Sequence, residues 1–166
     1  MVHQGLQVPA HGPLVPTGIE RRGRIVVQQG AAPAVARIFR SLYRDRVPVR
    51  RMEPIEKYKG SDFDSIEADN TSAFNCRKAT GSGRWSNHAY GTAIDINPIE
   101  NPWVEPGGVV YHAASRPFVK RTARPGVAVA GALVHAVAQD AAWLIAGQAG
   151  SSAISGSSGT AFLSSE

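Results

Sequence analysis

A β-branched run followed by a helical hydrophobic repeat constrains the fold of this chain most strongly. Residues 24–28 cluster Ile and Val between charged and polar neighbours, which indicates a short strand that ends at Gly30. Pro33 suits the first turn of a helix. The apolar residues after it recur at the period of an amphipathic helix that faces a core, and they are Val35, Ile38, Phe39, Leu42 and Tyr43. The pattern predicts a domain that mixes helix and strand.

Further elements follow along the chain. Residues 49–52 indicate another strand, and residues 93–97 form a strand pattern stopped by Pro98. Between them, residues 57–84 are polar and aperiodic, and so long a loop in a compact domain is usually functional. Prolines and glycines over residues 97–108 predict a rigid loop. A second helix is predicted over residues 130–146, with apolar positions Leu133, Val134, Val137, Ala141, Leu144 and Ile145.

The length of 166 residues is that of one domain, and such a chain buries a core without disulfides. We expect an N-terminal surface arm over residues 1–20, a domain over residues 21–146 and a tail over residues 147–166. Eleven of the twenty tail residues are Gly or Ser, a composition that orders poorly. The single cysteine, Cys76, excludes an intramolecular disulfide, and we expect it to be a small buried core residue.

The chain is basic, with a net charge of +5 and a pI near 9.8. A basic surface attracts nucleic acid, anionic lipid or the acidic polymers of a bacterial wall. No nucleic-acid-binding motif is present, so we expect no nucleic acid partner and interpret the basic stretches as solvated helix faces. No apolar stretch is long enough for a membrane span. The first fifteen residues lack the basic start and apolar run of a signal peptide.

One short stretch, residues 86–95, carries candidate metal chemistry. His88 and Asp95 bear side chains that bind zinc well, and Gly91 between them allows a tight turn that brings both to one point. Catalytic zinc has three protein ligands and a water. Taken alone, this pair is explained more often by a hydrogen-bonded structural histidine. Both interpretations stay open on spacing alone.

The longer context resembles a known family. The sequence Asn-Thr-Ser-Ala-Phe-Asn-Cys-Arg at 70–77, Gly81, Trp85, the pattern Ser-x-His-x-x-Gly-x-Ala-x-Asp at 86–95 and the Asn-Pro pairs at 97–98 and 101–102 resemble the M15 peptidases. These are the zinc D,D-carboxypeptidases and L-alanyl-D-glutamate endopeptidases of bacterial cell walls. The resemblance covers residues 24–103 and continues faintly through Pro125, Gly126 and Trp143.

The resemblance implies an α+β fold, a small antiparallel sheet flanked by helices similar to the D,D-peptidase or hedgehog-like fold, with zinc on the sheet. His88 and Asp95 match the first two metal ligands, and Arg77 matches the arginine that binds substrate near the scissile bond. A guanidinium suits that role because it donates in a fixed fork to carboxylate or carbonyl oxygen. The alternative for Arg77 is a surface ion pair without a functional role. We assign Ser86 and Tyr90 to the same substrate-binding set. The partner implied is a peptidoglycan stem peptide or related D-amino-acid peptide. The family implies a location in the cell wall or outside the cell, and we expect the protein to be a monomer.

The end of the chain departs from the family pattern. Ala161 stands where the third ligand, a histidine, belongs, and Ser158 stands at the general-base position. His112 is the better candidate to replace the third ligand because it lies in a loop-like stretch. His135 lies within the second predicted helix, where we expect a packed or surface histidine. We therefore expect weak zinc binding and impaired catalysis. Three readings stay open: an active hydrolase with a recruited ligand, a non-catalytic module that binds wall fragments, and a decayed chain.

Overall fold

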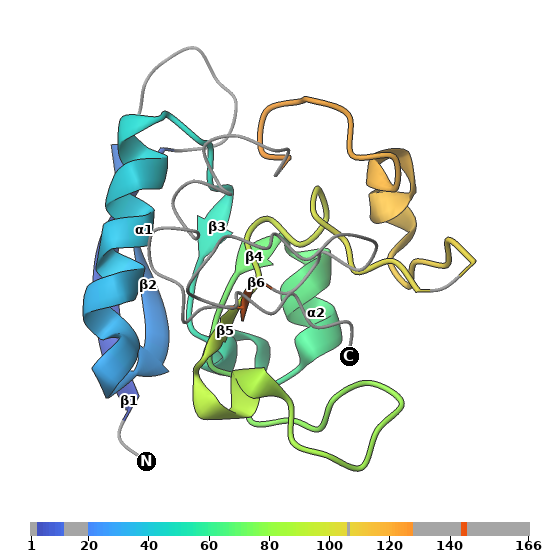
Figure 1. Ribbon diagram of the computed structural model, residues 1–166, viewed down its shortest axis with the longest axis horizontal. Helices are drawn as coiled ribbons and strands as arrows, with labels where there is room; N and C mark the ends of the chain where they lie inside the picture. Colours follow the sequence, from blue (N-terminus) through green and yellow to red (C-terminus); the bar gives the residue numbers. More distant parts are fainter. Residues whose placement is uncertain (1–2, 12–19, 106, 128–143, 146–166) are drawn as a thin grey trace, which may run out of the picture.

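The computed structural model describes residues 3–11, 20–105, 107–127 and 144–145 (Figure 1). Helices and short strands are mixed along the described chain, which confirms the α+β class. Strand pairing within these residues gives three two-stranded sheets, one antiparallel and two parallel. No helix in the described part of the chain is long and apolar enough to cross a membrane.

Strands β1 (His3–His11) and β2 (Glu20–Gln28) form an antiparallel hairpin with His3 opposite Gln28. The strand expected over residues 24–28 is thus part of a longer one. The aperiodic arm expected over residues 1–20 is wrong for residues 3–11, which pair with β2 along their whole length. Pro9 is compatible with this because both strands of a two-stranded sheet are edge strands, where proline is tolerated.

The helix predicted after Pro33 is α1 (Ala32–Arg44), which the short 3-10 helix η1 (Gln29–Ala31) precedes. Its buried face contains four of the five predicted core positions, while Tyr43 is partly exposed. The helix packs against the β1–β2 hairpin and runs along it (Figure 1). The resulting core joins the hairpin, α1 and the strand region after residue 93, and comprises Ile25, Val27, Ala31, Ala32, Val35, Ile38, Phe39, Leu42, Val49, Met52, Ala73, Ile94 and Ile96.

The stretch predicted as one long loop, residues 57–84, contains regular structure. Strand β3 (Arg51–Met52) pairs in parallel with β4 (Asn70–Thr71), and between them lie η2 (Ile55–Tyr58) and helix α2 (Asp62–Glu67). The hydroxyl of Ser61 accepts a hydrogen bond from Asp64 N at 3.1 Å and caps α2. A helix of this length presents too few residues to show a hydrophobic period, so only its cap marks it in the sequence.

The later elements are η3 (Asn87–Tyr90), β5 (Ala93–Ile94), η4 (Ala113–Phe118) and β6 (Leu144–Ile145), with β6 parallel to β5. The predicted helix over residues 130–146 lies outside the described residues except at residues 144–145, which form a strand instead. The tail over residues 147–166 lies outside them too. Cys76 is exposed, so the expectation of a buried cysteine is wrong. Ala73 and Asn75 are buried instead, and Arg77 N donates to the Asn75 carbonyl at 2.9 Å in a tight turn that has Cys76 at its centre.

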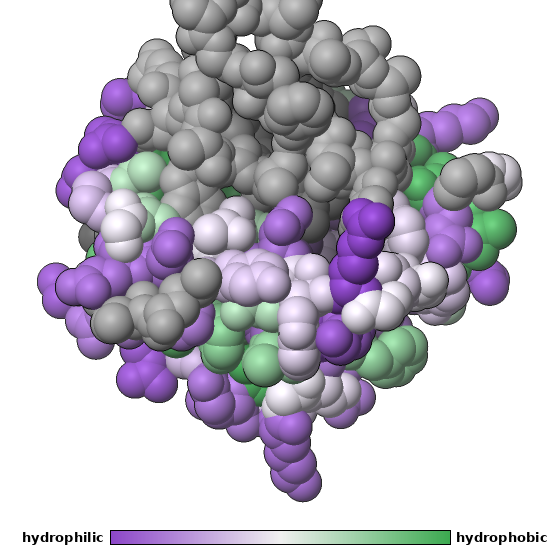
Figure 2. All heavy atoms as spheres, turned by 60° about the horizontal axis from the view of Figure 1, so that its bottom comes forward, coloured by the Kyte–Doolittle hydropathy of each residue, from purple (hydrophilic) through white to green (hydrophobic). Residues whose placement is uncertain are grey.

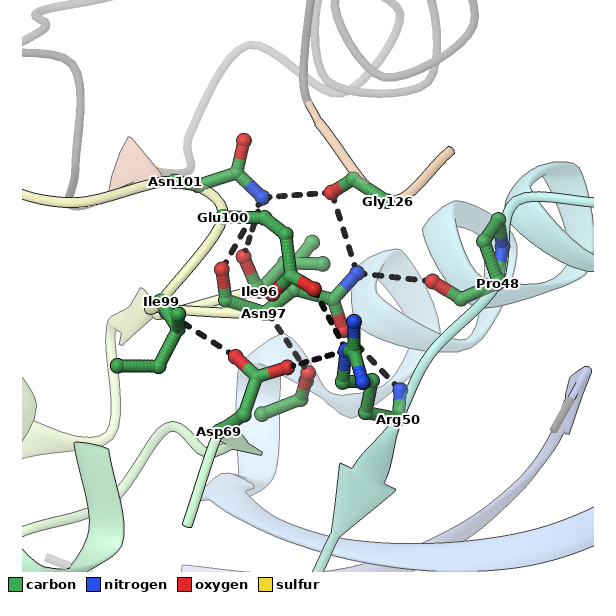
Figure 3. Close-up of polar contacts among 10 residues, drawn as sticks. Pro48, Arg50, Asp69, Ile96, Asn97, Ile99, Glu100, Asn101 and Gly126 are labelled. Atoms are coloured by element: carbon green, nitrogen blue, oxygen red, sulfur yellow. Dashed lines mark hydrogen bonds and ion pairs between the residues drawn. The ribbon is translucent and has the colours of Figure 1, made fainter. Parts of the chain in front are cut away.

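The rigid loop after β5 is anchored by asparagine side chains (Figure 3). Asn97 Nδ2 donates to the carbonyl oxygens of Pro48, at 2.8 Å, and Gly126, at 3.2 Å. Asn101 Nδ2 donates to the same Gly126 oxygen at 2.8 Å. The amide side chains therefore join residues 48, 97–101 and 126, and they hold the end of β5 in place.

A charge cluster with two buried carboxyl groups lies beside this anchor (Figure 3). Arg50 Nε is 3.0 Å from Asp69 Oδ2 and 2.5 Å from Glu100 Oε1. Both carboxyl groups are largely buried, and both form an ion pair with the same guanidinium. Burial and then the contact with Glu100 raise the pKa of Asp69 to about 7. Asp69 therefore keeps its proton until the pH approaches neutrality.

Candidate metal and substrate site

Residues 72–75 form the template on which the candidate site is built. Ser72 and Asp95 exchange two backbone hydrogen bonds, of 3.0 and 2.9 Å. The carbonyl of Ala73 contacts His88 Nδ1 at 2.7 Å, and Asn75 N donates to the His88 carbonyl at 3.0 Å. Phe74 N donates to Val26 O and ties the segment to β2. One short extended segment thus positions both candidate ligands.

The turn between the two candidate ligands depends on Ser86 and Gly91. The hydroxyl of Ser86 accepts from His88 N at 3.3 Å and caps η3. Gly91 ends η3 in the left-handed conformation, with φ +66°. A Cβ at Gly91 would lie 2.7 Å from the backbone nitrogen of Gln28, so glycine is required both by conformation and by space. The expected role of Gly91 as the tight turn is confirmed.

His88 and Asp95 meet at the end of this turn. His88 Nε2 lies 3.3 Å from Asp95 Oδ2, and the His88 ring is almost fully buried. A carbonyl oxygen only accepts hydrogen bonds, so the Ala73 carbonyl requires the hydrogen on Nδ1 and leaves the lone pair of a neutral ring on Nε2. This is the arrangement of a metal-bound histidine, whose other nitrogen donates to a carbonyl or carboxylate.

The separation of the two donor atoms also fits a metal ion. Two ligands at zinc bond lengths of about 2.0–2.2 Å in tetrahedral geometry lie about 3.3–3.6 Å apart. The observed 3.3 Å falls in that interval. His88 and Asp95 therefore fit two ligand positions of a zinc site by donor chemistry and by spacing. The same contact also fits an ion pair between imidazolium and carboxylate.

Charges around Asp95 oppose one another. Burial is the largest effect and raises the pKa of Asp95. The positive charges of His88 and Arg77 lower this pKa, and the negative charge of Asp62 raises it. The net direction is upward. A buried carboxylate of this kind is stabilised by a positive partner at its free oxygen, and a cation shared with His88 is one such partner.

Arg77 is held beside the pair by a residue that the sequence did not single out. Its Nε lies 2.9 Å from Asp62 Oδ1, and Asn75 Nδ2 donates to the same oxygen at 2.9 Å. Asp62 is the first residue of α2, inside the stretch interpreted as a loop, and its pairing with Arg77 spans fifteen residues. Only the three-dimensional fold reveals this contact.

The other predicted residues are dispersed. Ser86 is buried with its hydroxyl in the η3 cap, and Tyr90 is 40% exposed at the end of η3. His112 is not brought to the pair: its Nδ1 contacts Glu67 at 2.6 Å and its ring packs on Phe63. Among the described residues, no group of three or more His, Cys, Asp or Glu side chains is arranged to hold a metal ion. Ser158, Ala161 and His135 lie outside the described residues.

The surface at the lower end of Figure 1 comes forward in Figure 2. That face is mainly hydrophilic, and its hydrophobic side chains form separate small patches (Figure 2). Exposed aromatic residues near the site in sequence are Phe63, Trp85 and Tyr90, and Lys78 Nζ lies 3.8 Å from the centre of the Trp85 ring. A polar ligand suits such a face better than an extended apolar one.

The α+β fold thus brings His88 and Asp95 together, and Arg77 acts electrostatically on the Asp95 carboxyl group. Residues 80–143 match a family model described as D-alanyl-D-alanine carboxypeptidase, which confirms the resemblance to the M15 peptidases and supports a cell-wall peptidase-like domain. His88 and Asp95 lie inside the matched residues, whereas Arg77, Ser158 and Ala161 lie outside them. Comparison with curated proteins and with solved structures found no match.

Proposed function

We propose that this domain recognises peptidoglycan stem peptides, or related D-amino-acid peptides, at a site formed by His88, Asp95 and Arg77, and that its peptidase activity is impaired. The observation that carries the proposal is the 3.3 Å approach of His88 Nε2 to Asp95 Oδ2. The match to a D-alanyl-D-alanine carboxypeptidase model supports the class of ligand. The family also implies action at the cell wall or outside the cell, and we propose that the domain acts as a monomer.

His88 and Asp95 would hold zinc, the metal of the M15 peptidases. A bound zinc ion supplies Lewis-acid polarisation of the scissile carbonyl. The Ala73 carbonyl holds the His88 hydrogen on Nδ1 and so directs the Nε2 lone pair toward the site. Two protein ligands bind zinc more weakly than three, and Ala161 supplies no donor at the third position. We therefore propose weak metal binding.

Arg77 would recognise the peptide through the outer edge of its guanidinium. Nη1 donates to the Lys78 carbonyl at 3.2 Å, while Nη2 makes no hydrogen bond to another residue in the described part of the chain. Nη2 is thus available to a carboxylate or carbonyl oxygen of the ligand. Tyr90, exposed beside His88, would contact the same ligand, and Ser86 would act through the backbone of η3.

Catalysis is impaired in this proposal because the general base is missing. The hydroxyl of Ser158 takes up no proton at neutral pH, and loss of a general base costs about 10²–10⁴-fold in rate. Weak metal binding reduces the rate further. The alternative function, a non-catalytic module that binds wall fragments, uses the same site and differs only in having no turnover.

A paired assay separates these functions. Zinc content of the full chain after equilibration with zinc is measured alongside hydrolysis of a purified peptidoglycan fragment, and fragment binding is measured by calorimetry. We expect fragment binding with no measurable hydrolysis. Robust, chelator-sensitive hydrolysis would contradict the proposed impairment. If the chain binds neither zinc nor the fragment, the proposed site is contradicted. His88→Ala provides the matched control.

A further inference from the structure

The contact between Asp62 and Arg77 is the best-supported arrangement near the site that the proposed function does not use. Asp62 comes from α2, and Arg77 comes from the loop before η3, so the ion pair joins two separate elements. Asp62 Oδ1 is 2.9 Å from Arg77 Nε, and Asn75, itself only 3% exposed, donates to the same oxygen. One oxygen of Asp62 therefore has two partners, Arg77 and Asn75.

The ion pair controls which part of the guanidinium remains available. An arginine side chain has about 2 kcal/mol of rotamer entropy, and a free one samples many directions. Here Nε is buried, makes no hydrogen bond within the described residues and forms an ion pair with Asp62 at 2.9 Å, while Nη1 donates to the Lys78 carbonyl. Two of the three nitrogens are thus held by the protein, and the plane of the guanidinium is fixed with Nη2 left over.

Asp62 also balances a second attraction. Arg77 and Asp95 interact electrostatically, and so do Asp62 and Asp95, with the opposite effect on the Asp95 carboxyl group. Without the carboxylate of Asp62, the guanidinium is drawn toward Asp95, which is one of the candidate metal ligands. The negative charge of Asp62 keeps Arg77 on the substrate side of the site.

We propose that Asp62 is a positioning residue for peptide recognition, which acts by fixing the guanidinium of Arg77 so that its free edge meets a carboxylate of the ligand. This inference rests on the proposed function, because it assigns Arg77 to the ligand. Asp62 itself makes no contact with the peptide in this arrangement. The ligand class is a peptide with a free C-terminal carboxylate.

The test is a double-mutant cycle on the full chain, with an N-acylated peptide that ends in D-alanyl-D-alanine as the probe. Asp62→Asn keeps the shape and the acceptor for Asn75 but removes the charge. We expect about tenfold weaker binding in Asp62→Asn, and less than about twofold further loss when the same change is made in Arg77→Ala. Asp62→Glu is expected to recover part of the loss. Asp64→Asn, an exposed position two residues along the same helix, is the matched control and is expected to bind as the original chain does.

Several outcomes overturn the inference. The inference is wrong if Asp62→Asn binds the probe as tightly as the original chain does. It is also wrong if Asp62→Asn weakens binding equally in the Arg77→Ala background, because the effect then does not pass through Arg77. Failure of the original chain to bind the probe contradicts the proposed function instead. In that case the mobility of the Arg77 Nε–H bond, measured by NMR relaxation, decides: greater mobility in Asp62→Asn supports the positioning contact, and unchanged mobility refutes it.

Discussion

The Nδ1 hydrogen of His88 is directed at the carbonyl oxygen of Ala73 over 2.7 Å, and this one contact determines the chemistry of the other edge of the ring. Ala73 is a buried core residue, so its carbonyl is fixed by the packing around it. Nε2 is consequently held toward Asp95 with its lone pair exposed to that carboxylate. The hydrophobic core therefore reaches the candidate metal pair through Ala73, which contacts His88, and through Ile94 and Ile96 on either side of Asp95.

Replacement of Gly91 by alanine is expected to destabilise the domain more than the same change at a glycine of similar conformation. Gly91 and Gly81 have φ +66° and +70°, but only Gly91 lies against backbone, 2.7 Å from Gln28 N at the Cβ position. A left-handed alanine costs about 1–2 kcal/mol, and the overlap raises the loss in Gly91→Ala to about 2–4 kcal/mol. The free energy of unfolding from urea denaturation gives both values. Equal losses in Gly91→Ala and Gly81→Ala would show that the close approach to β2 is absent.

Stability is expected to fall as pH rises from about 4 to 7, because of Asp69. Its pKa is raised from 3.8 to about 7 in the folded protein. Between those values the folded state binds a proton that the unfolded state has lost, so the stabilisation is complete below 3.8 and is lost as pH rises through 7. The largest slope from one such group is about 1.4 kcal/mol per pH unit. Unfolding free energies over pH 4–8 measure this slope.

Asp69→Asn isolates that contribution. The amide does not titrate and keeps an oxygen for the hydrogen bond from Ile99 N, which is 3.0 Å in the present structure. We expect the variant to lose the negative slope and to match or exceed the original chain in stability at pH 8. Asp45→Asn, at an exposed position beyond α1, is the control and is expected to retain the slope. A slope that persists unchanged in Asp69→Asn would assign the effect to another group.

How much of this structure the sequence predicts depends on how local each signal is. Helix α1 was predicted because five apolar residues at helical spacing follow a proline, all within one segment. The meeting of His88 and Asp95 was predicted because the intervening glycine and the family pattern lie in ten consecutive residues. Both features are specified by neighbours in the chain.

The features that the sequence did not reveal depend on distant partners. Strand β1 contains Gly5 and Pro9, which suggest irregular structure, yet pairing with β2 supplies its hydrogen bonds. Helix α2 is too short for a period, and the contact of Asp62 with Arg77 joins residues from two elements. Cys76 follows the buried residue Asn75, but a tight turn between Asn75 and Arg77 is centred on it and its side chain is exposed.

Restoring the missing family residues is expected to restore metal binding before activity. Ala161→His adds a third zinc ligand, and Ser158→Asp adds a carboxylate at the general-base position. Zinc affinity is expected to rise in Ala161→His alone, whereas hydrolysis of a peptidoglycan fragment is expected only in the double variant. Calorimetric zinc titration and product analysis check the two effects separately. Ser157→Asp with Ala161→His, one residue displaced, is the control, and equal activity in that control would refute the positional assignment.

Zinc titration followed at the ring nitrogens of His88 by NMR tests the central claim most directly. The account predicts a zinc-dependent shift at Nε2, with the hydrogen retained on Nδ1 by the Ala73 carbonyl. It also predicts that Asp95→Asn greatly weakens the response, because the carboxylate supplies the second ligand. A His88 ring that does not respond to millimolar zinc, or one that responds equally in Asp95→Asn, would contradict the assignment of this pair as a metal site.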